Sequence, residues 1–182
     1  MNHKGTVKLE TDRLILRRFV IEDADDMFNN WAGDDEVTKF LTWPTHTSVD
    51  VSRKILSDWI ERYEKNDFYN WAIELKETGR VIGNISVVHM NDDIDCVTIG
   101  YCMSRQLWGQ RIMPEALGEV IAFMFDEVEA NRVEAYHDSN NPKSGRVMAK
   151  AGMKYEGTIR QADRNNQGIV DMVMYSVLSE EV

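Results

Sequence analysis

The chain has 182 residues, 43% of them hydrophobic, and 31 acidic against 21 basic residues give it a formal charge of −10. This length suits one hydrophobic core and is short for two, so we expect a single domain over residues 1–182. The negative charge would repel nucleic-acid phosphates and no long run of Lys or Arg offsets it, so a cationic amine is a more natural partner than a nucleic acid.

The two cysteines, Cys96 and Cys102, lie six positions apart on one predicted strand. This spacing is typical of neither a redox motif nor a zinc site, so we expect reduced thiols and no metal. The N-terminal segment has no apolar signal-peptide region, and no apolar run approaches the length that spans a membrane. We therefore expect a cytoplasmic location without membrane binding.

The first half of the chain predicts one strand followed by two helices. Leu14 to Phe19 is typical of a strand, and a helix follows from about Glu22 to Ala32, ended by Gly33. Ser48 can cap the second helix. That helix has apolar residues at every fourth position, so it should bury one face; they are Val51, Ile55, Trp59 and Tyr63.

Three antiparallel strands are predicted next, with a hairpin turn at Glu77 to Arg80 and a second turn at Asp92–Asp93. They cover Asn70 to Leu75, Val81 to Val88 and Val97 to Met103.

The remaining elements predict a mixed α/β sheet. A helix from Met113 to Glu127 separates Val97 to Met103 from Arg132 to Tyr136, and a strand that returns after a helical crossover must run parallel to its neighbour. Asn141 is then expected to cap a short helix that Gly152 ends. Two closing strands flank a turn at Asn165 to Gly168; they are Tyr155 to Arg160 and Val170 to Leu178.

The junction before the helix at Met113 predicts an anion site. Gly109 lies just ahead of a helix whose first turn carries Pro114, so free backbone N–H groups face outward there and can bind a phosphate. Either residue alone would be read as a turn glycine or a helix starter. Their position relative to Asn141 and Ser144 favours an acyl-coenzyme A site.

An ordered set of short motifs extends along nearly the whole chain. They are Arg13 to Arg18, Val81 to Gly83, Ile99 to Tyr101 leading to Trp108 to Gln110, Asn141 with Ser144, and Lys150 to Met153. No single motif is decisive, but the set at matching spacing resembles the GNAT N-acetyltransferases. Within that family it is similar to the RimJ and RimL branch of ribosomal-protein N-terminal acetyltransferases.

The resemblance implies a mostly antiparallel sheet of seven strands with helices on both faces. The fourth and fifth strands, here Val97 to Met103 and Arg132 to Tyr136, would run parallel and splay apart to admit the pantetheine arm of acetyl-CoA. A homodimer is also compatible with the resemblance. The implied acetyl-CoA-binding residues are Tyr101, Cys102, Met103, Gln106, Trp108, Gly109, Gln110, Arg111, Ile112, Met113, Asn141 and Ser144.

One position departs from the family pattern. The pyrophosphate loop of the family usually reads Gln/Arg-x-x-Gly-x-Gly/Ala, and this chain has Arg111 where the last small residue belongs. A side chain there could crowd the approach of the backbone to the phosphates, or its guanidinium could reach a phosphate itself. We expect binding to be retained but altered.

The implied reaction is attack of a neutral amine on a thioester, which needs a donor for the developing oxyanion and a hydrogen bond for the leaving sulfur. A backbone N–H near Met103 is the expected oxyanion donor, and Ser144 matches the serine that RimL-like enzymes place near the sulfur. Asp163 falls where that pattern has a glutamate base. An aspartate with a pKa near 3.9 is a weak base, although an α-amine with a pKa of about 8 needs little help, and a solvated hairpin aspartate is an equal alternative.

The acceptor side is less determined by the sequence. Trp43 and Pro44 resemble a Trp-Pro pair that borders the acceptor in this branch, which favours a protein or peptide α-amine. A small amine such as a polyamine, an amino sugar or an antibiotic shares the same acetyl donor. A non-catalytic acyl-CoA-binding module is a third reading, motivated by Arg111 and the weak base. His89 and His137 each end a strand near the expected cleft and are weaker candidates for a base.

Overall fold

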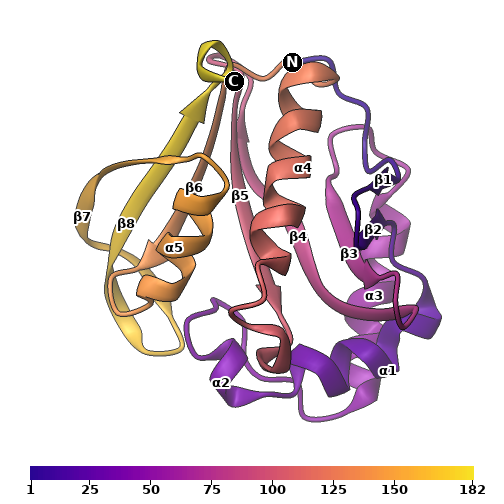
Figure 1. Cartoon of the computed structure of the whole chain (residues 1–182). Helices are drawn as coiled ribbons and strands as arrows, with labels where there is room; N and C mark the ends of the chain where they lie inside the picture. The colour runs from indigo at the N-terminus through magenta and orange to yellow at the C-terminus, as the bar shows by residue number, and fades with distance from the viewer.

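The computed structural model describes residues 1–182 as a twisted eight-stranded sheet with helices against both faces (Figure 1). The order across the sheet is β1-β2-β3-β4-β5-β6-β8-β7. All neighbouring strands pair antiparallel except β5 and β6, which run parallel as predicted. The strands are β1 (Leu9–Glu10), β2 (Leu14–Arg17), β3 (Asn70–Leu75), β4 (Arg80–Asn91), β5 (Cys96–Met103), β6 (Arg132–Asp138), β7 (Lys154–Asn165) and β8 (Gly168–Leu178).

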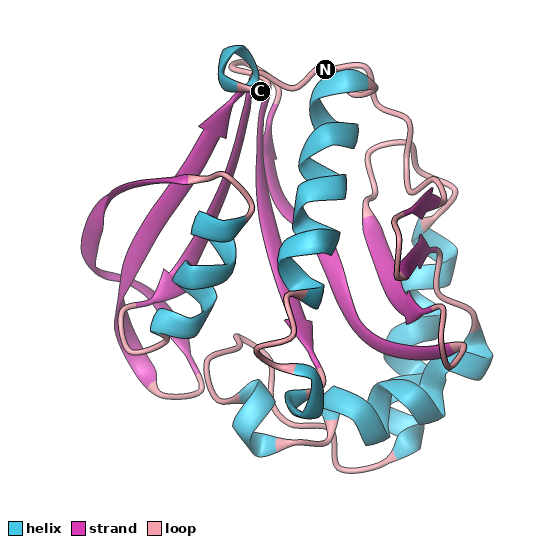
Figure 2. Cartoon of the chain, viewed as in Figure 1, coloured by secondary structure: helices cyan, strands magenta, loops and turns pink.

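The helices divide between the two faces of the sheet (Figure 2). One core cluster joins α4 and α5 to one face through residues such as Leu117 and Met148, and a second joins α1 and α3 to the other through Met27 and Leu56. None of the helices combines the length and apolar character needed to cross a bilayer. The helices are α1 (Ala24–Met27), α2 (Asp35–Thr38), α3 (Val49–Arg62), α4 (Ile112–Asp126) and α5 (Pro142–Lys150).

The parallel strands β5 and β6 separate partway along their length. They pair from Cys96 and Arg132 to Ile99 and Ala135 and no further. Beyond this point β5 stays with β4 as far as Met103, while β6 stays with β8, so the two strands diverge toward the bottom of Figure 1. The predicted splay of the parallel pair is therefore confirmed.

Several elements differ from the sequence prediction. β1 is an additional short strand, so the sheet has eight strands instead of seven. The first predicted helix is interrupted: α1 is followed by a π-helical turn over Phe28–Ala32, because the Gly33 N–H donates to the Phe28 carbonyl at 3.0 Å. A Cβ at Gly33 would lie 2.7 Å from that same oxygen, so this close approach requires glycine.

The face of α3 that packs on the core was predicted in part. Tyr63 is buried as expected, and Ile55 and Trp59 pack partly buried against the same core cluster, whereas Val51 is 37% exposed. Ser52 and Leu56 are also fully buried, and the Ser52 hydroxyl lies 2.8 Å from His46 Nδ1. The buried face is therefore wider than the predicted stripe.

A glycine holds β4 close to the diverging end of β5. A Cβ at Gly83 would lie 2.4 Å from the Cys102 carbonyl oxygen and 2.7 Å from Met103 Cα. We expect Gly83→Ala to lower the free energy of unfolding by about 1–3 kcal/mol. The atoms that a Cβ would meet belong to the backbone of β5, which cannot move aside without disturbing the strand. Urea denaturation measures the change.

Gly118→Ala in α4 is the matched control for this experiment. A Cβ there meets nothing within 4 Å. We expect it to raise stability by about 0.5–1 kcal/mol, since alanine is the better helix former. Equal urea midpoints for the two variants would contradict the close packing at Gly83.

Candidate functional site

A cleft of about 1280 Å³ passes through the sheet where β5 and β6 diverge. On the side of α4 and α5 it is lined by residues such as Tyr101 and Ser144. On the opposite side it is lined by Asn84, Cys102 and Asp138. Because successive side chains of a strand point to opposite faces, β5 and β6 supply walls on both sides. A ligand entering over α4 and α5 can thus meet a second ligand arriving from the other face.

The divergence leaves backbone groups of β5 without a strand partner. The Ser104 N–H donates to the Ile82 carbonyl of β4 at 2.8 Å. Residues of an antiparallel strand alternate in the direction of their hydrogen bonds, so the N–H groups of Met103 and Tyr101 point toward the opening. The Met103 carbonyl accepts from Trp108 Nε1 at 3.1 Å, and the Met103 N–H makes no backbone hydrogen bond outside the strand ladder. Its role as the oxyanion donor stays a prediction.

The start of α4 presents a group of free backbone donors. Gly109 has a φ of 83°, and the N–H groups of Gly109, Arg111, Ile112 and Met113 donate to no backbone carbonyl. They lie at the N-terminus of a 15-residue helix, whose dipole also favours a negative charge. This arrangement suits the pyrophosphate of an acyl-CoA.

Arg111 takes the backbone conformation that the family pattern assigns to a small residue. It is left-handed, with φ 60° and ψ 20°, and it is the N-cap of α4. Its side chain is exposed, lines the cleft and has no ion-pair partner. The loop therefore keeps its donors despite the arginine, and the guanidinium lies free beside them.

The start of α5 differs from the prediction in one respect. Asn141 is the N-cap residue, but its side chain makes no capping hydrogen bond, and neither does Ser48 at the start of α3. The prediction of side-chain capping was wrong at both positions. At α5 the Ser144 N–H donates to the Asn141 backbone carbonyl at 3.1 Å instead, and the Asn141 amide lines the cleft.

Tyr101 and Ser144 join the two walls of the cleft. The Tyr101 hydroxyl lies 3.0 Å from both the Ser144 carbonyl oxygen and the Ser144 Oγ. Burial raises the pKa of Tyr101, so the phenol stays protonated. Either hydroxyl can donate in this pair. Donation by the phenol to Ser144 Oγ leaves the Ser144 hydrogen free to point into the cleft, and the contact joins β5 to α5.

The cysteines are free thiols. Burial raises the pKa of Cys102 to about 12, and its S–H group donates to Asn84 Oδ1 at 3.0 Å. Burial also raises the pKa of Cys96 to about 11. A thiol that stays protonated is a poor nucleophile, so Cys102 is a wall of the cleft.

The two histidines have different positions. His137 is buried beneath α5, where a Cβ on Gly145 would lie 2.5 Å from its Nε2, and its Nδ1 lies 2.7 Å from the Asp138 carbonyl. His89 is exposed on β4 and does not line the cleft. No three His, Cys, Asp or Glu side chains form a group that could hold a metal ion.

The acceptor side is closed in part by the turn between β7 and β8. Asn166 donates from its backbone N–H to the Leu41 carbonyl at 3.1 Å. Its side-chain amide donates to the carbonyls of Thr38 and Trp43 at 2.9 and 2.8 Å. Trp43 lines the cleft, and Pro44 lies outside it. We call these contacts the Asn166 clasp; they hold the segment after α2 against the hairpin.

Asp163 lies at the rim of the cleft on β7. Its side chain is exposed, and Oδ1 accepts a hydrogen bond from the Arg164 N–H at 2.7 Å. The remaining predicted residues of the loop before α4, Gln106 and Gln110, are exposed and do not line the cleft, whereas Trp108 does. The Lys143 Nζ lies 5.1 Å from the centre of the Trp108 ring. This contact joins the segment before α4 to the start of α5 across the mouth of the cleft.

Sequence reasoning missed two features of the site. The Asn166 clasp joins residues more than 120 positions apart, and no local sequence pattern predicts it. Asp138, at the end of β6, is a buried carboxylate in the cleft wall. Asp138 could have been identified from the sequence, because it lies just after the predicted strand Arg132 to Tyr136, which borders the opening.

Comparison with known proteins gives consistent relatives. Residues 13–154 match the family model of the acetyltransferase (GNAT) domain. The uncharacterized N-acetyltransferase p20 of Bacillus licheniformis is 29% identical over 173 residues, which covers 95% of this chain and 97% of that protein. The [ribosomal protein uS5]-alanine N-acetyltransferase of Escherichia coli is 26% identical and covers 83% and 80%. The microcin C7 self-immunity acetyltransferase MccE, solved with acetyl-CoA and AMP, has a TM-score of 0.82 at 18% identity, covering 92% and 93%.

Arg111 provides a test of the anion site. We expect Arg111→Ala and Arg111→Gly each to raise the dissociation constant of acetyl-CoA by about tenfold, since a charge-assisted hydrogen bond to phosphate is lost. Isothermal titration calorimetry at low salt measures this. The glycine variant should also be more stable than the alanine variant by about 1 kcal/mol, because glycine relieves the left-handed backbone.

Arg53→Ala on α3 removes the same charge far from the cleft and is the control. Unchanged affinity in both Arg111 variants would contradict a contact between the guanidinium and the phosphates.

Proposed function

Because the chain belongs to the GNAT acetyltransferase family and is thus an acetyl-CoA-dependent N-acetyltransferase, we propose that its acceptor is the N-terminal α-amine of a protein or peptide. The observation that carries the proposal is the cleft that passes through the sheet between β5 and β6. It gives an acceptor its own entrance, on the face opposite α4 and α5. The names of relatives such as the uS5-alanine N-acetyltransferase support a protein terminus.

We propose that the start of α4 holds the pyrophosphate of acetyl-CoA and that the start of α5 holds the pantetheine arm. The free N–H groups of Gly109, Ile112 and Met113 support the first assignment. The uncommitted Asn141 amide supports the second. When bound, acetyl-CoA supplies the acetyl group and a thiol leaving group.

Three groups of the chain then serve the transfer. The Met103 N–H donates to the thioester oxygen as it gains negative charge. Ser144 Oγ, backed by Tyr101, donates to the departing sulfur. Asp163 at the rim passes the proton released by the amine to solvent. An α-amine with a pKa of about 8 is partly neutral at pH 7, so a weak base suffices.

The second candidate is a small amine acceptor. The Asn166 clasp supports it, because it covers part of the acceptor face and so restricts how bulky an acceptor can be. Both candidates share the acetyl donor and the three groups above, so only the choice of amine separates them.

The test is thiol release from acetyl-CoA in the presence of an amine panel. Peptides beginning with alanine or serine represent protein termini; spermidine and glucosamine represent small amines. We expect release with one or more of the peptides. Release with the small amines alone would overturn the protein-terminus proposal in favour of the second candidate.

Ser144→Ala separates catalysis from binding in the same assay. We expect kcat to fall by roughly tenfold, since one hydrogen bond to the leaving group is lost, while acetyl-CoA affinity changes little. If no amine in the panel releases thiol although acetyl-CoA binds tightly, the proposed acceptor class is wrong.

The clasp gives an independent prediction on the acceptor side. We expect Asn166→Ala to raise KM for the peptide several-fold and to leave the acetyl-CoA dissociation constant unchanged, because the segment from Thr38 to Trp43 loses two of its three hydrogen bonds to the turn. Gln167→Ala, in the same turn, is the control. Equal KM values for the two variants would show that the clasp does not shape the acceptor site.

A further inference from the structure

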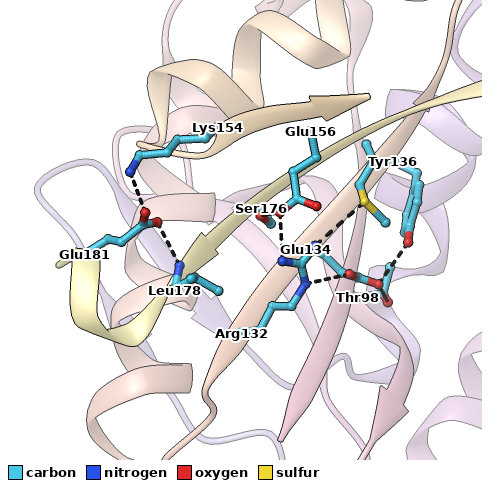
Figure 3. Close-up of polar contacts among 10 residues, drawn as sticks. Thr98, Arg132, Glu134, Tyr136, Lys154, Glu156, Ser176, Leu178 and Glu181 are labelled. Carbon is cyan, nitrogen blue, oxygen red and sulfur yellow. Dashed lines mark hydrogen bonds and ion pairs between the residues drawn. The ribbon is translucent and has the colours of Figure 1, made fainter. Parts of the chain in front are cut away.

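Glu134, Asp138 and Glu156 lie on one face of the β5–β6–β8–β7 region, and the two glutamates have a cationic partner. Figure 3 shows Arg132 between Glu134 and Glu156, with distances of 2.9 Å to Glu134 and 2.8 Å to Glu156. Glu134 also accepts from the hydroxyls of Thr98 and Tyr136 at 3.1 Å. Glu134 and Glu156 therefore share one cation within the protein, although its single charge offsets only one of theirs.

The third carboxylate, Asp138, has only neutral partners. It is 3% exposed. Oδ1 accepts from the N–H and side-chain amide of Asn140 at 2.8 and 3.1 Å, and Oδ2 accepts from the Asn165 amide at 2.8 Å. No Lys, Arg or His pairs with it. A buried carboxylate without a counter-charge is unfavourable, so a cationic ligand would be bound strongly there.

Asp138 also faces the place where acyl transfer has to occur. The β5–β6 register sets Ile99 beside Ala135, so continuing it would place Cys102 opposite Asp138 across the opening. Both residues line the cleft. His137 packs beneath α5, so the next residue of the strand points to the opposite, acceptor face.

We propose that Asp138 binds the ammonium form of the acceptor amine and accepts its first proton. This inference rests on the proposed function and names the group that recognises the substrate. One ammonium proton moves to Asp138 as the nitrogen lone pair forms the C–N bond. The C–S bond breaks with its electron pair on sulfur, the second nitrogen proton reaches that thiolate, and Asp138 releases its proton to solvent by way of the rim at Asp163.

Two successive asparagines link this carboxylate to the acceptor segment. Asn165 holds Asp138 Oδ2, and Asn166 holds the carbonyls of Thr38 and Trp43. The turn between β7 and β8 thus positions the carboxylate and the acceptor wall together.

Asp138→Asn tests the assignment with the alanyl peptide as the amine. We expect kcat/KM to fall by about 100-fold, because one partner of a desolvated charge pair is neutralised. The acetyl-CoA dissociation constant should stay unchanged, which also shows that the variant is folded. Asp93→Asn, an exposed residue outside the cleft, removes the same charge and should retain wild-type activity.

A measurement on the wild-type protein avoids any dependence on the folding of that variant. We expect the α-hydroxy analogue of the alanyl peptide, which carries no charge, to bind at least about tenfold more weakly than the amine. In Asp138→Asn this difference should disappear. Absence of turnover with every amine would refute the proposed function. Turnover with equal binding of amine and hydroxy analogue, or an unimpaired Asp138→Asn, would refute the role of Asp138 alone.

Discussion

The site depends on one constraint: the parallel pairing of β5 and β6 ends at Ile99 and Ala135 although both strands continue. Each strand then follows its other neighbour, β4 or β8. Gly83 permits β4 to hold the end of β5 closely. The divergence creates the cleft and turns the backbone N–H groups of Tyr101 and Met103 toward it. The proposed place of the reacting carbonyl thus depends on the loss of strand pairing in the sheet.

The N-termini of α4 and α5 supply further polar groups to the cleft between β5 and β6. α4 offers backbone donors next to Arg111, and α5 offers Ser144 and an uncommitted Asn141 amide. Arg111 keeps the left-handed backbone that a glycine would adopt more easily, which indicates that loop geometry outweighs the local strain. On the far face the polar groups come from β4, β6 and the β7–β8 turn, so the cleft has polar walls on both sides of one sheet.

The mixed sheet, its parallel pair and the helix after Arg111 were predictable, because they follow from local patterns and from the rule that a helical crossover returns a strand in parallel. The π-helical turn before Gly33 and the burial of Ser52 and Leu56 on α3 were not predictable. They depend on how closely Phe28, Ser52 and Leu56 pack against distant residues. Capping by Ser48 and Asn141 failed for a similar reason, since residue type gives the position of a helix start but not the direction of the side chain.

By itself the sequence determined the order of the main strands and of the long helices, the family and the places of Gly109, Ser144 and Met103, because these rest on spacing along the chain. Only the tertiary structure decided which groups meet across the opening. Asp138 is held by the amides of Asn140 and Asn165 and by no cation, and Asn166 reaches the segment after α2 because the β7–β8 turn folds back beside it. Such contacts join residues far apart in the sequence, so the periodicity of hydrophobic residues along the chain cannot predict them.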